Sequence, residues 1–265
     1  MLILMQDTKA VVASIEKLLG QVGVEGRSPP PPIPRFPWAP HDQLRCRIFA
    51  DKENEQTRVF ITFKSDSRAM ATPADYLYYM KHQLFHSVMN NRLFKVCRQE
   101  DAPFYSASFS SDTFVRVCAV HQVSIMPLED RILEAIEATQ TELARVRLYG
   151  ISQRELDIAK AEYLADVEAL YLERNQGYAN DLAGEYVRHF LNGELVVGEE
   201  IEARLSKTLI NLVTADDVKV SWWLTAALSH KIVFHQCFSA RCKSTESNVM
   251  MSHCGYEQVA CNAVS

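Results

Sequence analysis

The sequence predicts an α+β fold, in which a mostly antiparallel sheet is covered on one face by a layer of helices. Two observations support this prediction. Residues 57–65 and 103–125 have the composition and the alternation of strands. From residue 128 onward the apolar residues instead recur at helical spacing, so that a run of helices follows the strands.

Residues 1–54 predict a small strand–helix unit followed by a linker. An apolar run, "MLILM", precedes a helix, "KAVVASIEKLLG", which ends at Gly20. Seven prolines follow between residues 29 and 40. We expect an extended interdomain linker over residues 28–54, and a ligand for a proline-recognition domain is the alternative.

The central part of the chain predicts the sheet and a long helix between its strands. Residues 57–65 form one predicted strand, and residues 103–125 form two antiparallel strands joined near residues 111–112. Residues 73–96 predict a helix that begins at Pro73, because proline is tolerated in a first helical turn. The apolar face of this helix consists of Leu77, Met80, Leu84 and Val88.

Helices continue through the second half of the chain. A helix from residue 128 ends at Gly150, and the next helix begins with a capping box formed by Ser152 and Glu155. The inward-facing residues of the first helix are predicted to be Ile132, Ile136, Leu143 and Val146. Later helices are expected at about residues 178–191, at 198–212 and from Thr214 onward.

Composition and charge narrow the class of protein. With 265 residues, of which 48% are hydrophobic, the chain is long enough for one large domain or two smaller ones. A net charge of −5 and a pI of about 5.9 argue against an obligatory nucleic-acid partner, since phosphate binding needs clustered Lys and Arg. We expect neither a signal peptide nor a membrane span, and the seven cysteines are expected to be free thiols.

His82 and His86 are the first candidate metal ligands. They lie four residues apart, on one face of the predicted helix, which is the spacing of a zinc-binding pair. A hydrolytic zinc helix also needs a glutamate at one of two positions, which here hold Gln83 and Phe85, and neither side chain can act as a base. We therefore reject this pair as a metal site and expect an ordinary helix face, with one of the histidines half buried.

A second set of candidate ligands lies in residues 221–265, a tail in which we find no sustained periodicity. Its potential soft zinc ligands are His235, Cys237, Cys242, His253 and Cys254. Their spacing matches no paired C-x-x-C and H-x-x-x-H pattern, so we also reject this metal site. A shifted reading frame or mis-splicing is the expected origin of the tail.

A specific order of motifs runs through residues 1–219. The motifs are "QDTKAVVASIEKLLG", "NRLFKVCRQEDAPFYSASFSS", "VRLYGISQRELDIAKAEYL" and "LINLVTADDV". In this order they resemble the insulinase and pitrilysin family of zinc metallopeptidases, the inverzincins. The first motif is similar to the end of that family's first α/β domain, and the other three are similar to its second domain.

This resemblance implies a domain organisation. Residues 1–27 would be a remnant of the zinc-bearing first domain, 28–54 the linker, 55–220 the second α+β domain and 221–265 an atypical tail. Inverzincins hold zinc on an H-x-x-E-H helix of the first domain and place no metal on the helix that contains His82. We therefore expect a truncated member of the family, with zinc in the full-length family and no cofactor in this chain.

The resemblance also points to Arg98 and Tyr105. In the family, an arginine and a tyrosine at this spacing grip the substrate backbone and stabilise the oxyanion, as a guanidinium and a phenol can by donating hydrogen bonds. In the half of the enzyme that carries zinc, however, the equivalent pair is mainly structural. Arg98 would then pair with an acidic residue such as Glu100, and Tyr105 would pack at the start of a strand. Both roles stay open from the sequence.

The function implied by the resemblance is that of a non-catalytic domain in the substrate chamber of a zinc metalloendopeptidase. Such a chain would be inactive alone and would contact unfolded or flexible peptides in the intact enzyme, together with a partner half. The alternative is a catalytically silent structural subunit that pairs with an active peptidase chain, and a globular module without activity is a third reading. Neither nucleic acid nor a membrane is an expected partner, and the family suggests an intracellular location, in some members a plastid or a mitochondrion.

Overall fold

The computed structural model of the chain describes residues 7–20, 45–50, 56–219 and 230–237. The helices are α1 (Thr8–Leu19), α2 (Pro73–Cys97), α3 (Ile132–Tyr149), α4 (Gln153–Glu173), α5 (Ala179–Asn192), α6 (Gly198–Leu209) and the 3-10 helix η1 (Ile210–Leu212). The strands are β1 (Arg45–Ala50), β2 (Arg58–Asp66), β3 (Phe104–Val115), β4 (Cys118–Pro127) and β5 (His230–Cys237). Among the described helices, none combines the length and the hydrophobicity that a membrane crossing requires.

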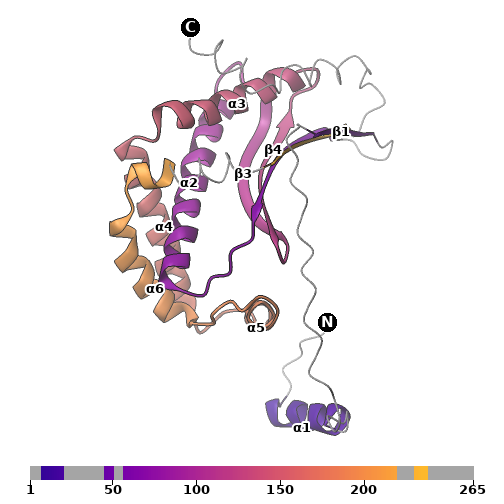
Figure 1. Ribbon diagram of the computed structural model, residues 1–265, viewed down its shortest axis with the longest axis vertical. Helices are drawn as coiled ribbons and strands as arrows, with labels where there is room; N and C mark the ends of the chain where they lie inside the picture. Colours follow the sequence, from indigo (N-terminus) through magenta and orange to yellow (C-terminus); the bar gives the residue numbers. More distant parts are fainter. Residues whose placement is uncertain (1–6, 21–44, 51–55, 220–229, 238–265) are drawn as a thin grey trace.

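The sheet confirms the predicted fold class. Its strands lie in the order β1-β5-β2-β4-β3, and the pairs β5–β2, β2–β4 and β4–β3 are antiparallel, whereas β1 and β5 are parallel. Helices α2, α3, α4 and α6 lie on one side of strands β3 and β4 (Figure 1). Alternate residues of β2 and β4 point into this helical layer and are buried there: Val59, Ile61, Phe63, Val123 and Ile125.

The turn between β3 and β4 lies at Arg116 and Val117, so the predicted turn near residues 111–112 is wrong. Ser111 and Asp112 are strand residues, and Ser111 pairs with His121 across the hairpin. Serine and aspartate are frequent in turns, which is why the sequence suggested a turn here. In the structure the polar side chain of Ser111 instead lines a polar pocket. Here the Ser111 hydroxyl lies within hydrogen-bonding distance of two histidines.

Two strands occur in segments for which no strand was predicted. Strand β1 lies within the predicted linker 28–54, and β5 lies within the predicted tail 221–265, where it pairs with both β1 and β2. A short strand whose partners are distant in the sequence has no periodic signal of its own. The expected strand "MLILM" lies outside the described residues, and α1, which follows it, has no buried residue.

The long central helix α2 begins as predicted and is buried on two sides. Thr72 caps its first turn by accepting a hydrogen bond from the backbone N–H of Asp75 at 3.2 Å, and Pro73 is its first residue. The predicted face is confirmed, since Met80, Leu84 and Val88 are buried and Leu77 is partly buried. Helix α2 packs against β3 on one side and against α4 and α6 on the other (Figure 1).

The other helix signals are confirmed as well. Helix α3 ends at Gly150, whose φ of 76° favours glycine, and Ile136, Leu143 and Val146 of this helix are buried. The capping box of Ser152 forms at the start of α4. The predicted pair near residue 214 also forms, because the backbone N–H of Asp217 donates to Thr214 Oγ1 at 3.2 Å.

Side chains of α2 cover the edge strand β3. The amide of Asn90 accepts a hydrogen bond from the backbone N–H of Phe109 at 2.7 Å and donates one to its carbonyl oxygen at 3.1 Å. Cys97 Sγ donates to the carbonyl oxygen of Tyr105 at 2.8 Å. Backbone groups that an edge strand would otherwise expose are thereby satisfied, and α2 is fixed in register with β3.

Arg92 joins α2 to the turn between α3 and α4. Its Nε and Nη2 donate to the two carboxylate oxygens of Glu155 at 2.8 and 2.9 Å, and Nη2 also donates to the carbonyl oxygen of Gly150 at 3.3 Å. Glu155 closes the capping box by accepting from the backbone N–H of Ser152 at 2.8 Å. The hydrogen bond from Arg92, followed by those from Ser152, lowers the pKa of Glu155 to about 2.

We expect Glu155→Gln to lower the free energy of unfolding by about 1.5–3 kcal/mol at pH 7, because glutamine keeps the capping geometry but loses the charged partner of Arg92. Since the folded-state pKa lies below the ordinary value of 4.5, the stabilisation by the carboxylate is present above pH 4.5 and is lost as the pH falls toward 2. Denaturant unfolding should therefore show a smaller penalty at pH 3 than at pH 7. The matched control Glu173→Gln, at the exposed last residue of α4, should change stability by less than about 0.5 kcal/mol. An equal penalty for Glu155→Gln at both pH values would contradict this interpretation.

Candidate functional site

A pocket of about 330 Å³ lies between α2 and the sheet. Its wall is formed by the end of β2, by α2 near residue 82, and by the parts of β3 and β4 that flank their turn. Most of the lining side chains are polar or charged, among them Ser65, Asp66, Arg68 and Asp112. The site is therefore a polar opening at the end of an otherwise apolar interface between helix and sheet.

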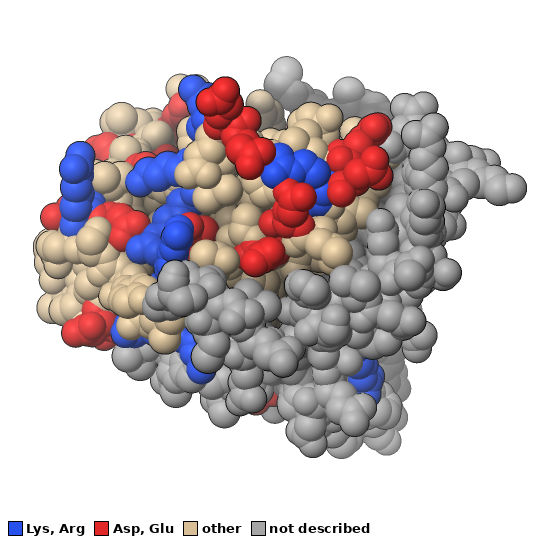
Figure 2. All heavy atoms as spheres, turned by 90° about the horizontal axis from the view of Figure 1, so that it is seen from above, with Lys and Arg blue, Asp and Glu red and all other residues tan. Residues whose placement is uncertain are grey.

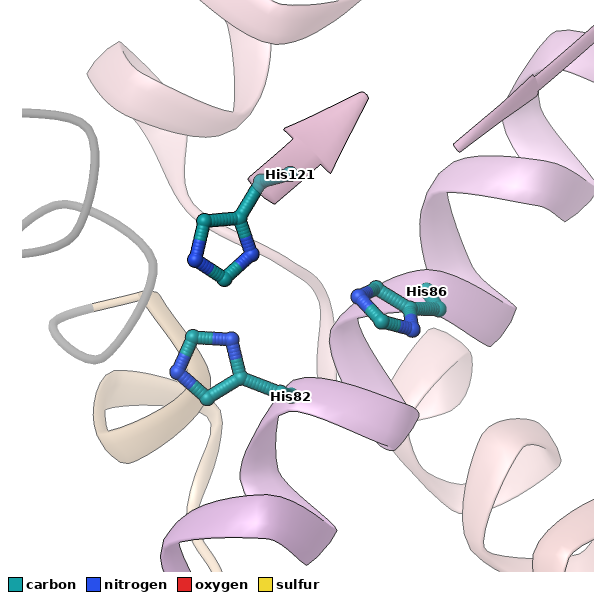
Figure 3. A group of neighbouring side chains, drawn as sticks. All are labelled: His82, His86 and His121. Atoms are coloured by element: carbon teal, nitrogen blue, oxygen red, sulfur yellow. The ribbon is translucent and has the colours of Figure 1, made fainter. Parts of the chain in front are cut away.

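Three histidines meet in this pocket. His82, His86 and His121 have exposed fractions of 5%, 9% and 5%, and their potential ligand nitrogens all lie within 4.8 Å of one another. His82 and His86 occupy successive turns of α2, whereas His121 comes from β4 (Figure 3). The rings of His82 and His121 are stacked, with centroids 5.5 Å apart and planes inclined by 23°.

The two-residue alternation along β2, β3 and β4 explains which sheet residues face the histidines of α2. Along each strand, every second residue faces the helices, so Ser65 follows Phe63 on the inner face of β2. In the same way Ser111 follows Phe109 on β3, and His121 precedes Val123 on β4. The register places Ser111 and His121 in one row with Phe63, whereas Ser65 pairs with Ala119 in the next row. The polar residues of the three strands thus lie in two adjacent rows, where they face His82 and His86.

Two serine hydroxyls connect the histidines. Ser65 Oγ lies 3.0 Å from His121 Nε2, and Ser111 Oγ lies 2.6 Å from His121 Nδ1 and 2.8 Å from His86 Nε2. A hydroxyl carries one proton, so it can donate to only one of the two histidine nitrogens and must accept a hydrogen bond from the other. This alternation suits neutral imidazoles, each of which offers one donor and one acceptor.

Burial keeps the three imidazoles uncharged at neutral pH. Desolvation lowers the pKa of His82 and of His86 to about 4, with His82 adding to the effect on His86. It lowers the pKa of His121 to about 3, and the two other histidines contribute. Neutral imidazoles retain the nitrogen lone pair that binds a transition metal, but they do not attract anions.

The residues in the pocket do not fit the hydrolytic zinc of an H-x-x-E-H helix. Gln83 lines the pocket, and Phe85 is buried with its ring edge-on to Phe109, at a centroid distance of 5.2 Å. No carboxylate therefore stands at either position from which a base could activate a bound water. The groups closest to the histidine nitrogens are serine hydroxyls, and the carboxylates of Asp66 and Asp112 also line the pocket.

The sequence prediction for this helix was confirmed in part. His82 and His86 share one face of α2 as expected, but both are buried, whereas only one was expected to be half buried. His121 was not recognised as their neighbour. The alternation of β4 could have placed it on the buried face with Val123 and Ile125, yet the pattern does not reveal which helix packs there.

The remaining candidate ligands lie beyond this pocket or outside the described residues. His235 and Cys237 belong to β5, of which only the backbone is described. Cys242, His253 and Cys254 lie outside the described residues. The rejected tail site is therefore neither supported nor contradicted by the described geometry.

Arg98 and Tyr105 are both exposed, and Arg98 lies at the opposite end of α2 from the pocket. Arg98 follows the last residue of α2, about 18 Å along the helix from His86. Its guanidinium carbon lies 5.3 Å from the centroid of the Phe94 ring, and within the described residues we find this contact rather than an ion pair with Glu100. Tyr105 is 62% exposed rather than packed at the start of β3.

Comparison with known proteins gives relatives among zinc proteases. The chain is 34% identical over 212 residues to a zinc protease PQQL-like protein of Arabidopsis thaliana, covering 80% of this chain and 19% of that protein. Its fold is similar to the first half of the periplasmic protease PqqL from Escherichia coli, with a TM-score of 0.81 and 16% identity over 96% of this chain and 54% of that chain. The ferredoxin protease FusC, solved in complex with Arabidopsis ferredoxin, is similar with a TM-score of 0.63 and 12% identity over 86% of this chain and 26% of that chain.

These matches cover only part of the related proteins. The chain spans about a fifth of the length of the Arabidopsis relative and about half of the solved first half of PqqL. A family model described as the peptidase M16 inactive domain matches residues 5–163, which is more than half of the chain and includes α1, α2 and strands β1 to β4. The chain therefore belongs to the peptidase M16 inactive domain family, a non-catalytic domain of insulinase-type zinc peptidases.

Proposed function

We propose that the chain forms a non-catalytic wall of the substrate chamber of an insulinase-type zinc endopeptidase, in which another domain holds the hydrolytic zinc. The match of residues 5–163 to the inactive domain carries this proposal. The sequence contains no H-x-x-E-H run, so this chain supplies none of the ligands of the hydrolytic ion. By itself it should bind peptides weakly and hydrolyse none.

The open face of the sheet supports a role in peptide contact. The face of β3 and β4 opposite to Phe109 and Val123 points away from the helical layer (Figure 1). It carries short hydroxyl side chains, including the exposed Ser108 and Ser110. Hydroxyl groups both donate and accept hydrogen bonds, which suits the backbone of an extended peptide of any sequence.

The expected substrates are unfolded or flexible peptides. The structural relative FusC was solved with a protein, ferredoxin, which shows that a protein of this fold can bind a protein. On the face seen in Figure 2, acidic and basic side chains are interspersed over the described part of the surface. Such a mixed surface does not favour substrates of one charge sign, so flexibility would select substrates more than charge does.

The isolated 265-residue chain should not cleave a quenched fluorescent peptide, with or without a chelator. Joined to a first domain that carries H-x-x-E-H, it should support cleavage that a chelator abolishes, because the zinc and its base then face the completed chamber. The control is the same assembly with the glutamate of that motif replaced by glutamine, which should be inactive. Chelator-sensitive cleavage by the isolated chain would sink the proposal, and a stable inactive complex would favour a silent partner subunit.

Arg98 and Tyr105 are proposed to contact the substrate backbone in the assembled enzyme. The hydrogen bond from Cys97 to the carbonyl of Tyr105 holds the end of α2 against the start of β3, and the side chains of Arg98 and Tyr105 are both exposed. Neither is buried in a structural network, which favours the substrate role over the structural alternative.

In the assembled enzyme, Arg98→Ala or Tyr105→Phe should lower kcat by about 100-fold or more, which is the cost of losing one donor to an oxyanion. Cleavage of a fluorescent peptide at several concentrations would separate kcat from KM. The matched controls Arg174→Ala and Tyr178→Phe change an exposed arginine and tyrosine near the end of α4 and should leave both constants unchanged. Unaltered turnover in both Arg98→Ala and Tyr105→Phe would remove the catalytic role.

A further inference from the structure

We propose that His82, His86 and His121 bind one divalent transition-metal ion of the zinc class, which links α2 to the sheet at β4. This site differs from a hydrolytic H-x-x-E-H centre in its ligands and in the elements that supply them, because the third ligand comes from a strand and no glutamate accompanies the pair. The inference is independent of the proposed peptidase role, since it rests on the pocket alone.

The geometry requires only a small adjustment for binding. Zinc–nitrogen bonds of about 2.0–2.1 Å in a tetrahedral site place neighbouring ligand nitrogens about 3.3 Å apart. The three histidines already offer nitrogens within 4.8 Å of one another, so side-chain rotation has to close at most about 1.5 Å. The i and i+4 spacing on α2 fixes two ligands on one helix face, and the pairing of β4 with β2 and β3 fixes the third.

The donor atoms select the class of ion. Imidazole nitrogens suit zinc, copper, iron and nickel, whereas magnesium and calcium prefer sets of oxygen ligands. Three imidazoles leave a fourth position open, and the adjoining pocket of about 330 Å³ has room for a water molecule there. Asp66 and Asp112 line the same pocket and offset the positive charge of the ion, with Arg68 as the opposing charge.

The serines supply the outer contacts that metal-bound histidines usually have. If His121 binds the ion through Nδ1, its Nε2–H can donate to Ser65, which lies 3.0 Å away. If it binds through Nε2, its Nδ1–H can donate to Ser111, which lies 2.6 Å away. Either arrangement fixes the ring orientation. The hydroxyl of Ser111 also lies 2.8 Å from His86 Nε2, so Ser111 orients two ligands if His121 binds through Nε2 and His86 through Nδ1.

An ion at this position would add a bond between α2 and the sheet where the inner face of β3 and β4 becomes polar. Phe63 pairs with His121, and beyond the pair of Phe109 and Val123 the inner face of β3 and β4 continues with Ser111 and His121. The binding free energy of an ion held by both elements adds directly to the stability of their contact. The ion would therefore act as a clamp between two layers of the domain.

The experiment uses the untagged 265-residue chain, stripped by a chelator and titrated with Zn²⁺ by calorimetry and with Co²⁺ by visible spectroscopy. We expect one ion per chain, a tetrahedral Co²⁺ spectrum without a thiolate charge-transfer band, and a rise in Tm on zinc binding. His121→Gln should lower the affinity for zinc by at least about 100-fold and abolish the rise in Tm. Ser111→Ala should lower the affinity by about 10–100-fold, as expected for an outer contact.

Two controls make the result specific. His189→Gln, on the exposed helix α5, should leave zinc affinity unchanged. The double variant Cys237→Ser and Cys242→Ser should also bind zinc normally, which separates this pocket from the cysteines of the tail. Absence of stoichiometric binding, equal affinity in His121→Gln, or loss of binding only in the cysteine variant would overturn the proposal. Should His121→Gln fail to fold by circular dichroism, the Co²⁺ spectrum of the unaltered chain decides, because a thiolate band would exclude a three-histidine site.

Discussion

Helix α2 lies between the sheet and the outer helices, and no residue from Met80 to Leu93 is exposed. Each polar side chain in its middle must therefore find a partner inside the protein, because an unsatisfied buried group costs about 1–3 kcal/mol. Asn90 bonds the backbone of the edge strand, Arg92 bonds Glu155, and His86 lies against Ser111. These contacts fix α2 relative to the sheet and to the turn between α3 and α4, and with it the pocket and the surface at Arg98.

The histidine pocket is difficult to explain by stability alone. Replacing both partners of a buried hydrogen bond by apolar groups of the same shape is often neutral or stabilising. Phe63 pairs with His121 across β2 and β4 and is fully buried, which shows that an apolar residue fits in the same row. The polar cluster of Ser65, Ser111 and the three histidines is therefore better accounted for by a ligand than by packing.

The two ends of α2 have different surroundings and different proposed roles. The histidines are enclosed between the sheet and the middle of the helix. Arg98, which follows the last residue of α2, and Tyr105, at the start of β3, are exposed. A rigid helix transmits its position along its whole length, because every backbone hydrogen bond within it resists bending. A metal clamp in the pocket would thus also hold in place the end of the helix near Arg98, where substrate contact is proposed.

The sequence by itself determined the helices and their ends, the α+β order and the family. Pro73, Gly150 and the Ser152–Glu155 box act through contacts within a few residues, so their effects can be read locally. Only the tertiary structure decided the positions of β1 and β5, the turn after Val115 and the meeting of His121 with the histidines of α2. Strand pairing and side-chain clusters join residues that are distant in the chain. A local period shows which face of an element is buried, but it cannot show what that face is buried against.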